Sequence, residues 1–98
     1  MGDSAPAPAP AVRPDNLYVR SALARLRESP DDTDALLVIG SWHLLSGRPE
    51  KALEYLNRVT QLEPKYPGVW RVKAKAFDAL GDTTNAEACR RRGSDRFS

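Results

Sequence analysis

Residues Asp34–Pro64 read DALLVIGSWHLLSGRPEKALEYLNRVTQLEP. The stretch holds two apolar runs, Leu36–Leu45 and Ala52–Leu62, and each is long enough for a helix of about 12–14 residues. Gly47 suits the left-handed residue that follows a helix C-terminus, and Pro49 suits the first turn of the next helix. Because so few residues separate the runs, the stretch predicts two antiparallel helices packed as a hairpin.

The hairpin recurs further along the chain at a constant interval. The matching positions are Leu36 and Trp70, Gly40 and Ala74, His43 and Phe77, Gly47 and Gly81, and Ala52 and Ala86, all 34 residues apart. A fixed period of this length is typical of an array of helical hairpins that stack on one another. The sequence therefore predicts at least two stacked copies of one unit.

With these residues the chain resembles the tetratricopeptide-repeat family, whose pattern is a large apolar residue, Leu-Gly, Tyr, Ala, Phe and Pro. The first copy carries Leu36, Ile39-Gly40, His43, Ala52, Leu56 and Pro64, and the second, weaker copy carries Trp70, Lys73-Ala74, Phe77, Ala86 and Arg90. The resemblance implies an all-α fold, with antiparallel helical hairpins stacked as a short right-handed α-solenoid of about five helices. An ordinary antiparallel helical bundle is the alternative.

The five helices are expected at 16–29, 33–46, 49–62, 68–80 and 83–92. The helix at 33–46 is apolar on nearly every face, so we expect it at the centre of the molecule. Gly40 should let the next helix approach closely, opposite Ala52. The helix at 16–29 is either the second helix of an incomplete repeat or a capping helix.

Three segments follow from this pattern. Residues 1–14 hold an alternating Ala-Pro run and are expected to be a disordered linker or tail, with a ligand for a proline-recognising domain as the alternative. Residues 15–93 form the helical domain. Residues 94–98 are expected to be a flexible tail, because Gly93 should end the last helix.

Composition excludes several classes of protein. Lys and Arg number 15 against 13 Asp and Glu, which is no signature of a nucleic-acid-binding domain, and the RRRGSDRF tail does not change that balance. One cysteine allows no internal disulfide. No run approaches the roughly 18 apolar residues of a membrane span, and no secretory signal is seen at the N-terminus. We therefore expect a cytoplasmic protein.

Few residues could carry chemistry. His43 is the only histidine and stands at the family's tyrosine position, so we interpret it as a packing residue rather than a base or metal ligand. Cys89 has arginine neighbours that could lower its pKa, but no partner histidine, and is interpreted as a small packing residue. The acids of Asp31–Asp34 suit helix capping. We expect no catalytic site, no metal and no cofactor.

A binding surface is better supported. The resemblance implies that the first helix of each repeat lines a concave face, and that some relatives bind acidic C-terminal ends of partner proteins there with basic and amide side chains. Arg71 and Lys75 stand at two such positions, but Leu37 and Ser41 stand at the matching ones, so that carboxylate clamp is incomplete. A solvated helix face would equally explain Arg71, Lys73 and Lys75. The expected partner-binding residues are Leu37, Ser41, Leu44, Leu45, Arg71, Lys75 and Asp78.

These expectations favour a non-catalytic adaptor or scaffold that binds a protein or peptide segment, acidic or amphipathic in character, in a shallow groove. Two alternatives remain open. One is an assembly or secretion chaperone that masks an apolar surface of a partner subunit. The other is self-association into a homo-oligomer through the open end of the array.

Overall fold

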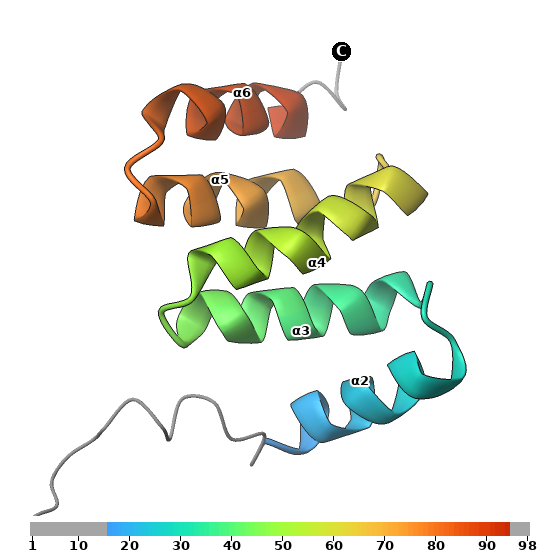
Figure 1. The fold of residues 1–98 in the computed structure, drawn as a ribbon. Helices are drawn as coiled ribbons and strands as arrows, with labels where there is room; N and C mark the ends of the chain where they lie inside the picture. The colour runs from blue at the N-terminus through green and yellow to red at the C-terminus, as the bar shows by residue number, and fades with distance from the viewer. Residues whose placement is uncertain (1–15, 95–98) are drawn as a thin grey trace, which may run out of the picture.

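The computed structural model describes residues 16–94, which form five α-helices and contain no strand (Figure 1). The helices are α2 (Leu17–Glu28), α3 (Thr33–Leu45), α4 (Pro49–Leu62), α5 (Val69–Ala79) and α6 (Thr83–Ser94). The all-α prediction is confirmed, and each helix lies within two residues of its expected bounds at both ends.

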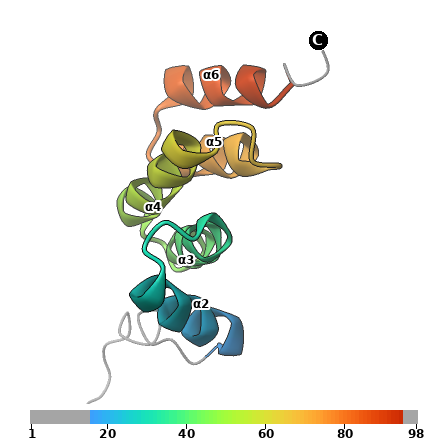
Figure 2. The ribbon, with the colours of Figure 1, turned by 90° about the vertical axis from the view of Figure 1, so that its right-hand side faces the viewer.

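The helices stack in chain order, each against the next, from α2 at one end to α6 at the other (Figure 1). The most extensive contacts are those within the two hairpins, α3 with α4 and α5 with α6. In the view of Figure 2, α4 lies to one side, while α3 and α5 lie together on the other. The arrangement is a short stack of antiparallel hairpins, as the repeat predicted, in which the first helices of both hairpins share one side.

Both hairpins end their first helix with the same hydrogen bonds. In the first, the Gly47 N–H donates to Leu44 O at 3.1 Å and the Arg48 N–H donates to His43 O at 2.9 Å. Thirty-four residues later, Gly81 donates to Asp78 O at 3.0 Å and Asp82 to Phe77 O at 2.9 Å. Both glycines have a left-handed backbone, with φ of 80° and 76°. The repeat is thus visible in the backbone as well as in the sequence.

The centre of the stack is apolar and lies between α3, α4 and α5. Its buried members are Leu36, Ala52, Leu56, Val59, Val69 and Ala76. A second cluster joins α2 to α3 through Val19, Ala22, Ala35 and Ile39. Helix α3 contributes to both clusters, which confirms its predicted central place and explains why it is apolar on nearly every face.

Gly40 marks the closest approach of α4 to α3, as expected, but its neighbours differ from those expected. A Cβ atom placed on Gly40 would lie 2.9 Å from Leu56 Cδ2 and 3.3 Å from Tyr55 Cβ. The atoms nearest to that Cβ thus belong to Leu56 and Tyr55, about one helical turn beyond Ala52. The shift of about one helical turn places the large Leu56 side chain in the space that the glycine leaves.

Gly93 does not end α6, contrary to the prediction. The helix continues through Gly93 to Ser94, and a Cβ on Gly93 would lie 3.6 Å from Trp70 Cβ. A glycine inside a helix costs about 1 kcal/mol but does not terminate it where packing continues. The segments expected at 1–14 and at 95–98 lie outside the described residues.

Candidate functional site

The expected partner-binding residues lie in register on α3 and α5. Leu37, Ser41 and Leu44 are half-buried, whereas Arg71, Lys75 and Asp78, each 34 residues later, are exposed. Residues four apart on a helix share a face, so each trio forms one stripe along its helix. We call these six residues together with Leu45 the α3/α5 surface. Leu45, at the end of α3, is 87% exposed.

The charges on this surface are unevenly paired. Asp78 accepts a hydrogen bond from Arg90 of α6 at 2.9 Å, and Arg90 also pairs with Glu87 at 3.1 Å. Arg71 and Lys75 form no ion pair with any residue between 16 and 94. Within the described residues the surface therefore presents two cations without an ion pair beside half-buried leucines, while Asp78 is paired with the neighbouring helix.

Lys73 does not belong to this surface. A solvated face shared with Arg71 and Lys75 was one interpretation of its charge, but Lys73 is only 8% exposed. The reason is helical geometry, because a residue two positions from Arg71 is rotated about 200° around α5 and faces the interior. The signal was present in the sequence, since the 34-residue period places Lys73 at the position of the core residue Ile39.

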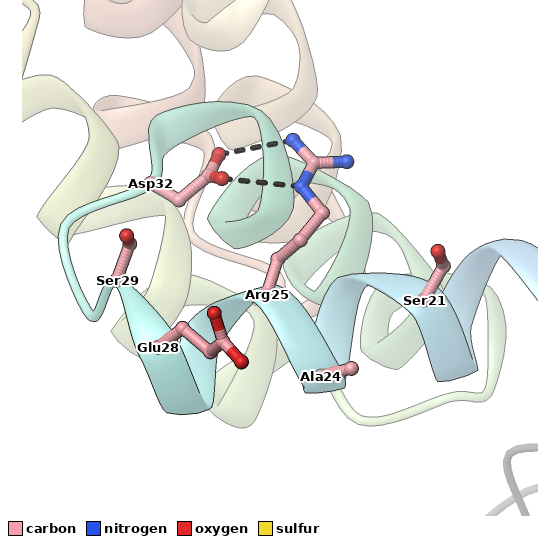
Figure 3. Close-up of a pocket in the computed structure, with 6 residues that line it drawn as sticks. All are labelled: Ser21, Ala24, Arg25, Glu28, Ser29 and Asp32. Atoms are coloured by element: carbon pink, nitrogen blue, oxygen red, sulfur yellow. Dashed lines mark hydrogen bonds and ion pairs between the residues drawn. The ribbon is translucent and has the colours of Figure 1, made fainter.

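The acidic start of α3, Asp31–Asp34, forms polar contacts with α2, with α4 and with the α4–α5 connection. Asp32 caps the helix, accepting from the Ala35 N–H at 3.0 Å, and also accepts two hydrogen bonds from Arg25 of α2, both at 3.1 Å (Figure 3). Asp31 pairs with Arg58 of α4. The predicted role at the helix start is confirmed for Asp32, which caps α3, and for Asp34, which lies in its first turn, whereas Asp31 connects the start of α3 to α4.

Two further residues at this end of α3 bind to the segment around the α4–α5 connection. Thr33 donates to Glu63 Oε2 at 2.8 Å, and Tyr66 donates its phenolic hydrogen to Asp34. The bond to Asp34, together with burial, raises the pKa of Tyr66 to about 12. Pattern reasoning missed both pairs, because their members are 30 and 32 residues apart and no local rule links them.

A hollow on α2 lies beside this network and is lined by Ser21, Ala24, Arg25, Glu28, Ser29 and Asp32 (Figure 3). Arg25 and Asp32 point toward each other across it and satisfy one another with two hydrogen bonds. The hydrogen bond and the charge of Arg25 lower the pKa of Asp32. The hollow therefore holds an ion pair in use and one further acid, the exposed Glu28.

His43 is a packing residue in the structure. It is 5% exposed, its ring stacks on Tyr55 with centroids 5.4 Å apart, and it touches Trp42 at 4.8 Å. Its Nδ1 atom has no hydrogen-bond partner among the residues that the structure describes. Burial lowers the pKa of His43, and the cations Arg48 and Lys51 lower it further.

This environment predicts a loss of stability in mild acid. The folded state keeps His43 neutral, whereas the unfolded chain protonates it near pH 6.5, so the free energy of unfolding should fall as pH drops below about 6.5. The variant His43→Phe, which copies Phe77 of the second repeat, should lose less stability between pH 7.5 and 5.5. Urea denaturation of both proteins at the two pH values measures this. Equal losses would contradict the prediction, because the chain has no other histidine.

Cys89 is likewise buried, at 5% exposed. Burial raises the pKa of its thiol and outweighs the neighbouring cations, which lower it. The arginines considered from sequence therefore do not make it a thiolate. Among residues 16–94, no three His, Cys, Asp or Glu side chains lie together as metal ligands would. None of the described helices combines the length and the apolar character needed to cross a membrane.

Comparison with known proteins agrees with the repeat geometry. Residues 33–76, which cover α3, α4 and most of α5, match the family model described as tetratricopeptide repeat. The chain is 38% identical over 48 residues to a TPR repeat-containing protein of Pseudomonas aeruginosa, covering 49% of this chain and 46% of that protein. It is 45% identical over 47 residues to an uncharacterized protein of Methanocaldococcus jannaschii, covering 48% and 55%. No solved structure matches.

Residues 33–76 thus match the tetratricopeptide repeat, and the chain spans about half the length of the curated relatives it matches. Repeats of this family generally mediate protein–protein interaction and are typically non-catalytic. That role agrees with a stack whose first helices, α3 and α5, lie on one side (Figure 2).

Proposed function

We propose that this protein is a cytoplasmic adaptor that binds a segment of a protein partner on the α3/α5 surface. The observation that carries the proposal is the pair of exposed cations, Arg71 and Lys75, with no ion-pair partner among the described residues and with half-buried leucines in register on α3. Cations beside apolar side chains suit a peptide that is acidic on one side and apolar on the other.

The seven residues of the α3/α5 surface have different roles in the proposed binding. Leu37, Leu44 and the exposed Leu45 supply apolar contact, and Ser41 supplies a hydroxyl one turn from Leu37. On α5, Arg71 can bind a carboxylate with two hydrogen bonds and Lys75 adds a second positive charge. Asp78 is already paired with Arg90, so its role is to hold α6 beside the surface. A surface this small fits micromolar affinity.

Reversing the charges on α5 tests the proposal. The double variant Arg71→Glu/Lys75→Glu should weaken binding of a fluorescein-labelled acidic peptide with interspersed leucines at least about tenfold, which corresponds to about 1.4 kcal/mol. Both side chains are exposed, so the thermal midpoint should stay close to that of the natural chain. Fluorescence anisotropy measures the affinity and circular dichroism the stability.

A matched control changes the same number of charges elsewhere. Arg20 and Arg27 are exposed on α2 and have no ion pair within the described part of the chain, so Arg20→Glu/Arg27→Glu alters the net charge equally. This control should bind the peptide far better than the α5 variant. Equal binding by the two variants would reject the α3/α5 surface and leave only a general charge effect.

A chaperone role is the second candidate, and the exposure of Leu45 favours it. A leucine that is 87% exposed beside half-buried leucines is what an apolar surface covered in a complex would show. Co-expression that keeps an otherwise insoluble partner in solution, and that fails with Leu45→Ser, would favour this role over a plain adaptor. Self-association is a separate question that size-exclusion chromatography at high concentration answers.

A further inference from the structure

A group of apolar core residues has polar counterparts one repeat period later in the chain. Ile39 of α3 is fully buried, and the partly buried Leu26 of α2 and Tyr55 of α4 pack against its cluster. The residues 34 positions later are Lys73, Thr60 and Cys89. An amine, a hydroxyl and a thiol therefore stand in corresponding places between α4, α5 and α6. Lys73, Thr60 and Cys89 lie on three different helices. The last two make the surroundings of Lys73 more polar than the apolar residues at the corresponding positions would.

The lysine is held in a defined position. Lys73 Nζ donates a hydrogen bond to Thr60 Oγ1 at 3.4 Å and lies 4.6 Å from the centroid of the Trp70 ring. The Thr60 hydroxyl in turn donates to Asn57 O at 3.0 Å, which leaves its lone pairs free to accept from the lysine. Arg92 of α6 reaches the same indole, with Cζ 4.5 Å from the ring centroid.

Two cations therefore share one aromatic ring, and no carboxylate accompanies them within the described residues. Two acids of the second hairpin, Asp78 and Glu87, are both paired with Arg90. Burial lowers the pKa of Lys73, and the charge of Arg92 lowers it further. A buried cation is costly without a counterion, and this one has a second cation as its neighbour.

The unused hydrogen-bond donors indicate what would stabilise the cluster. An ammonium carries three N–H donors and a guanidinium five, and neither can accept a hydrogen bond. Lys73 uses one donor, on Thr60, and Arg92 uses none on the described residues. The indole N–H of Trp70 is occupied by Pro64 O at 2.7 Å, which fixes the ring. The group that complements such a cluster is a small acceptor with negative charge.

We propose that Lys73, Arg92 and Trp70 form a binding site for one oxyanion group, either a carboxylate or a phosphate. Arg92 would hold two of its oxygens with the guanidinium fork, and Lys73, whose ammonium lies over the indole ring, would add a point charge. Arg71 and Lys75 take no part, so the site is separate from the α3/α5 surface and goes beyond the adaptor role.

The natural chain contains only two tryptophans, so Trp42→Phe leaves Trp70 as the single fluorescent reporter. In this background, sodium phosphate and sodium succinate are titrated separately against sodium chloride of equal ionic strength. We expect a saturable change in Trp70 fluorescence with at least one of the two anions. A response to phosphate alone, to succinate alone or to both tells which oxyanion the site takes.

Three substitutions decide whether the response comes from the site. Lys73→Ile restores the residue of the first repeat and should fold, yet it should weaken anion binding at least about tenfold. Arg92→Gln should weaken binding similarly. Arg91→Gln removes the same charge from an exposed neighbour that does not touch Trp70, and should bind as the parent does.

Thermal midpoints of the natural sequence provide a readout that does not depend on Trp42→Phe. Phosphate or succinate should raise the midpoint of the natural chain and of Arg91→Gln, but not that of Lys73→Ile. The proposal is overturned if neither anion changes the fluorescence or the midpoint beyond the effect of chloride. It is also overturned if all variants respond to the anions alike. Lys73 would then be a buried lysine whose charge is stabilised by the Trp70 ring, with no role in anion binding.

Discussion

Replacing Leu56 with alanine should destabilise the fold by about 2–5 kcal/mol. Leu56 is fully buried on α4, belongs to the central cluster, and fills the space opposite Gly40. The substitution removes apolar contacts and leaves a cavity. Gly40 has no side chain to occupy it, and the packed helices can relax into it only in part. A domain of about 80 residues is stable by only about 4–12 kcal/mol, so the thermal midpoint should fall by at least about 10 °C.

Leu45→Ala is the matched control for this variant. It makes the same chemical change on α3 at a side chain that is 87% exposed, so it should alter the free energy of unfolding by less than about 0.5 kcal/mol. Urea denaturation followed by circular dichroism compares the two. If Leu56→Ala and Leu45→Ala gave similar small losses, the central cluster would not hold the hairpins together, and the stacked arrangement would lose its main physical support.

The fold could be predicted because its determinants are local and repeated. Gly47 and Gly81 end their helices with the same hydrogen bonds, and Pro49 begins α4 as expected. Asn16 and Asp32 cap α2 and α3 with their side chains, and Asp32 is one of the acids expected to do so. Each of these features depends on a few neighbouring residues, which is why a single sequence was enough to place them.

The site was harder to predict because its features depend on contacts between distant residues. Arg71 and Lys75 are exposed as expected, but Asp78 proved to be paired with Arg90, twelve residues away on the next helix. For Lys73 the sequence left two interpretations open, a solvated face suggested by its charge and the interior position suggested by the repeat, and the structure buries it. Where residue type and repeat position disagree, as at Lys73, the position in the repeat decided the burial.

The presence of a charged residue at an interior position of the repeat sets Lys73 apart from its counterpart Ile39. A repeat array needs each interior position filled, and isoleucine does this in the first copy at no electrostatic cost. A lysine at the same place loses the hydration of its charge when it is buried. Here its ammonium instead contacts the Thr60 hydroxyl and the Trp70 ring. The fold does not require polar residues at these interior positions, but a binding site within the stack would require them.

Introducing a side chain at Gly40 should be nearly as damaging as emptying the space of Leu56. The variant Gly40→Val should destabilise the fold by about 3 kcal/mol or more, because even the first added carbon would lie 2.9 Å from Leu56 Cδ2 and 3.0 Å from Leu56 Cγ. Helix α4 would have to move away from α3, and the contacts of Ala52 and Leu56 would loosen together. Thermal and urea denaturation measure the loss.

Gly93 supplies the control, because it too is a glycine inside a helix. A Cβ there would meet Trp70 Cβ at 3.6 Å, an ordinary contact, so Gly93→Ala should stabilise the protein by about 0.5–1 kcal/mol through helix propensity. Gly40→Ala has the same gain in propensity but must displace Leu56, so its net effect should be destabilising. Opposite signs for one substitution at two helical glycines would show that the close approach of α4 to α3 is what requires Gly40. Stabilisation at both positions would mean that Leu56 moves aside freely and that the hairpin is packed more loosely than the structure shows.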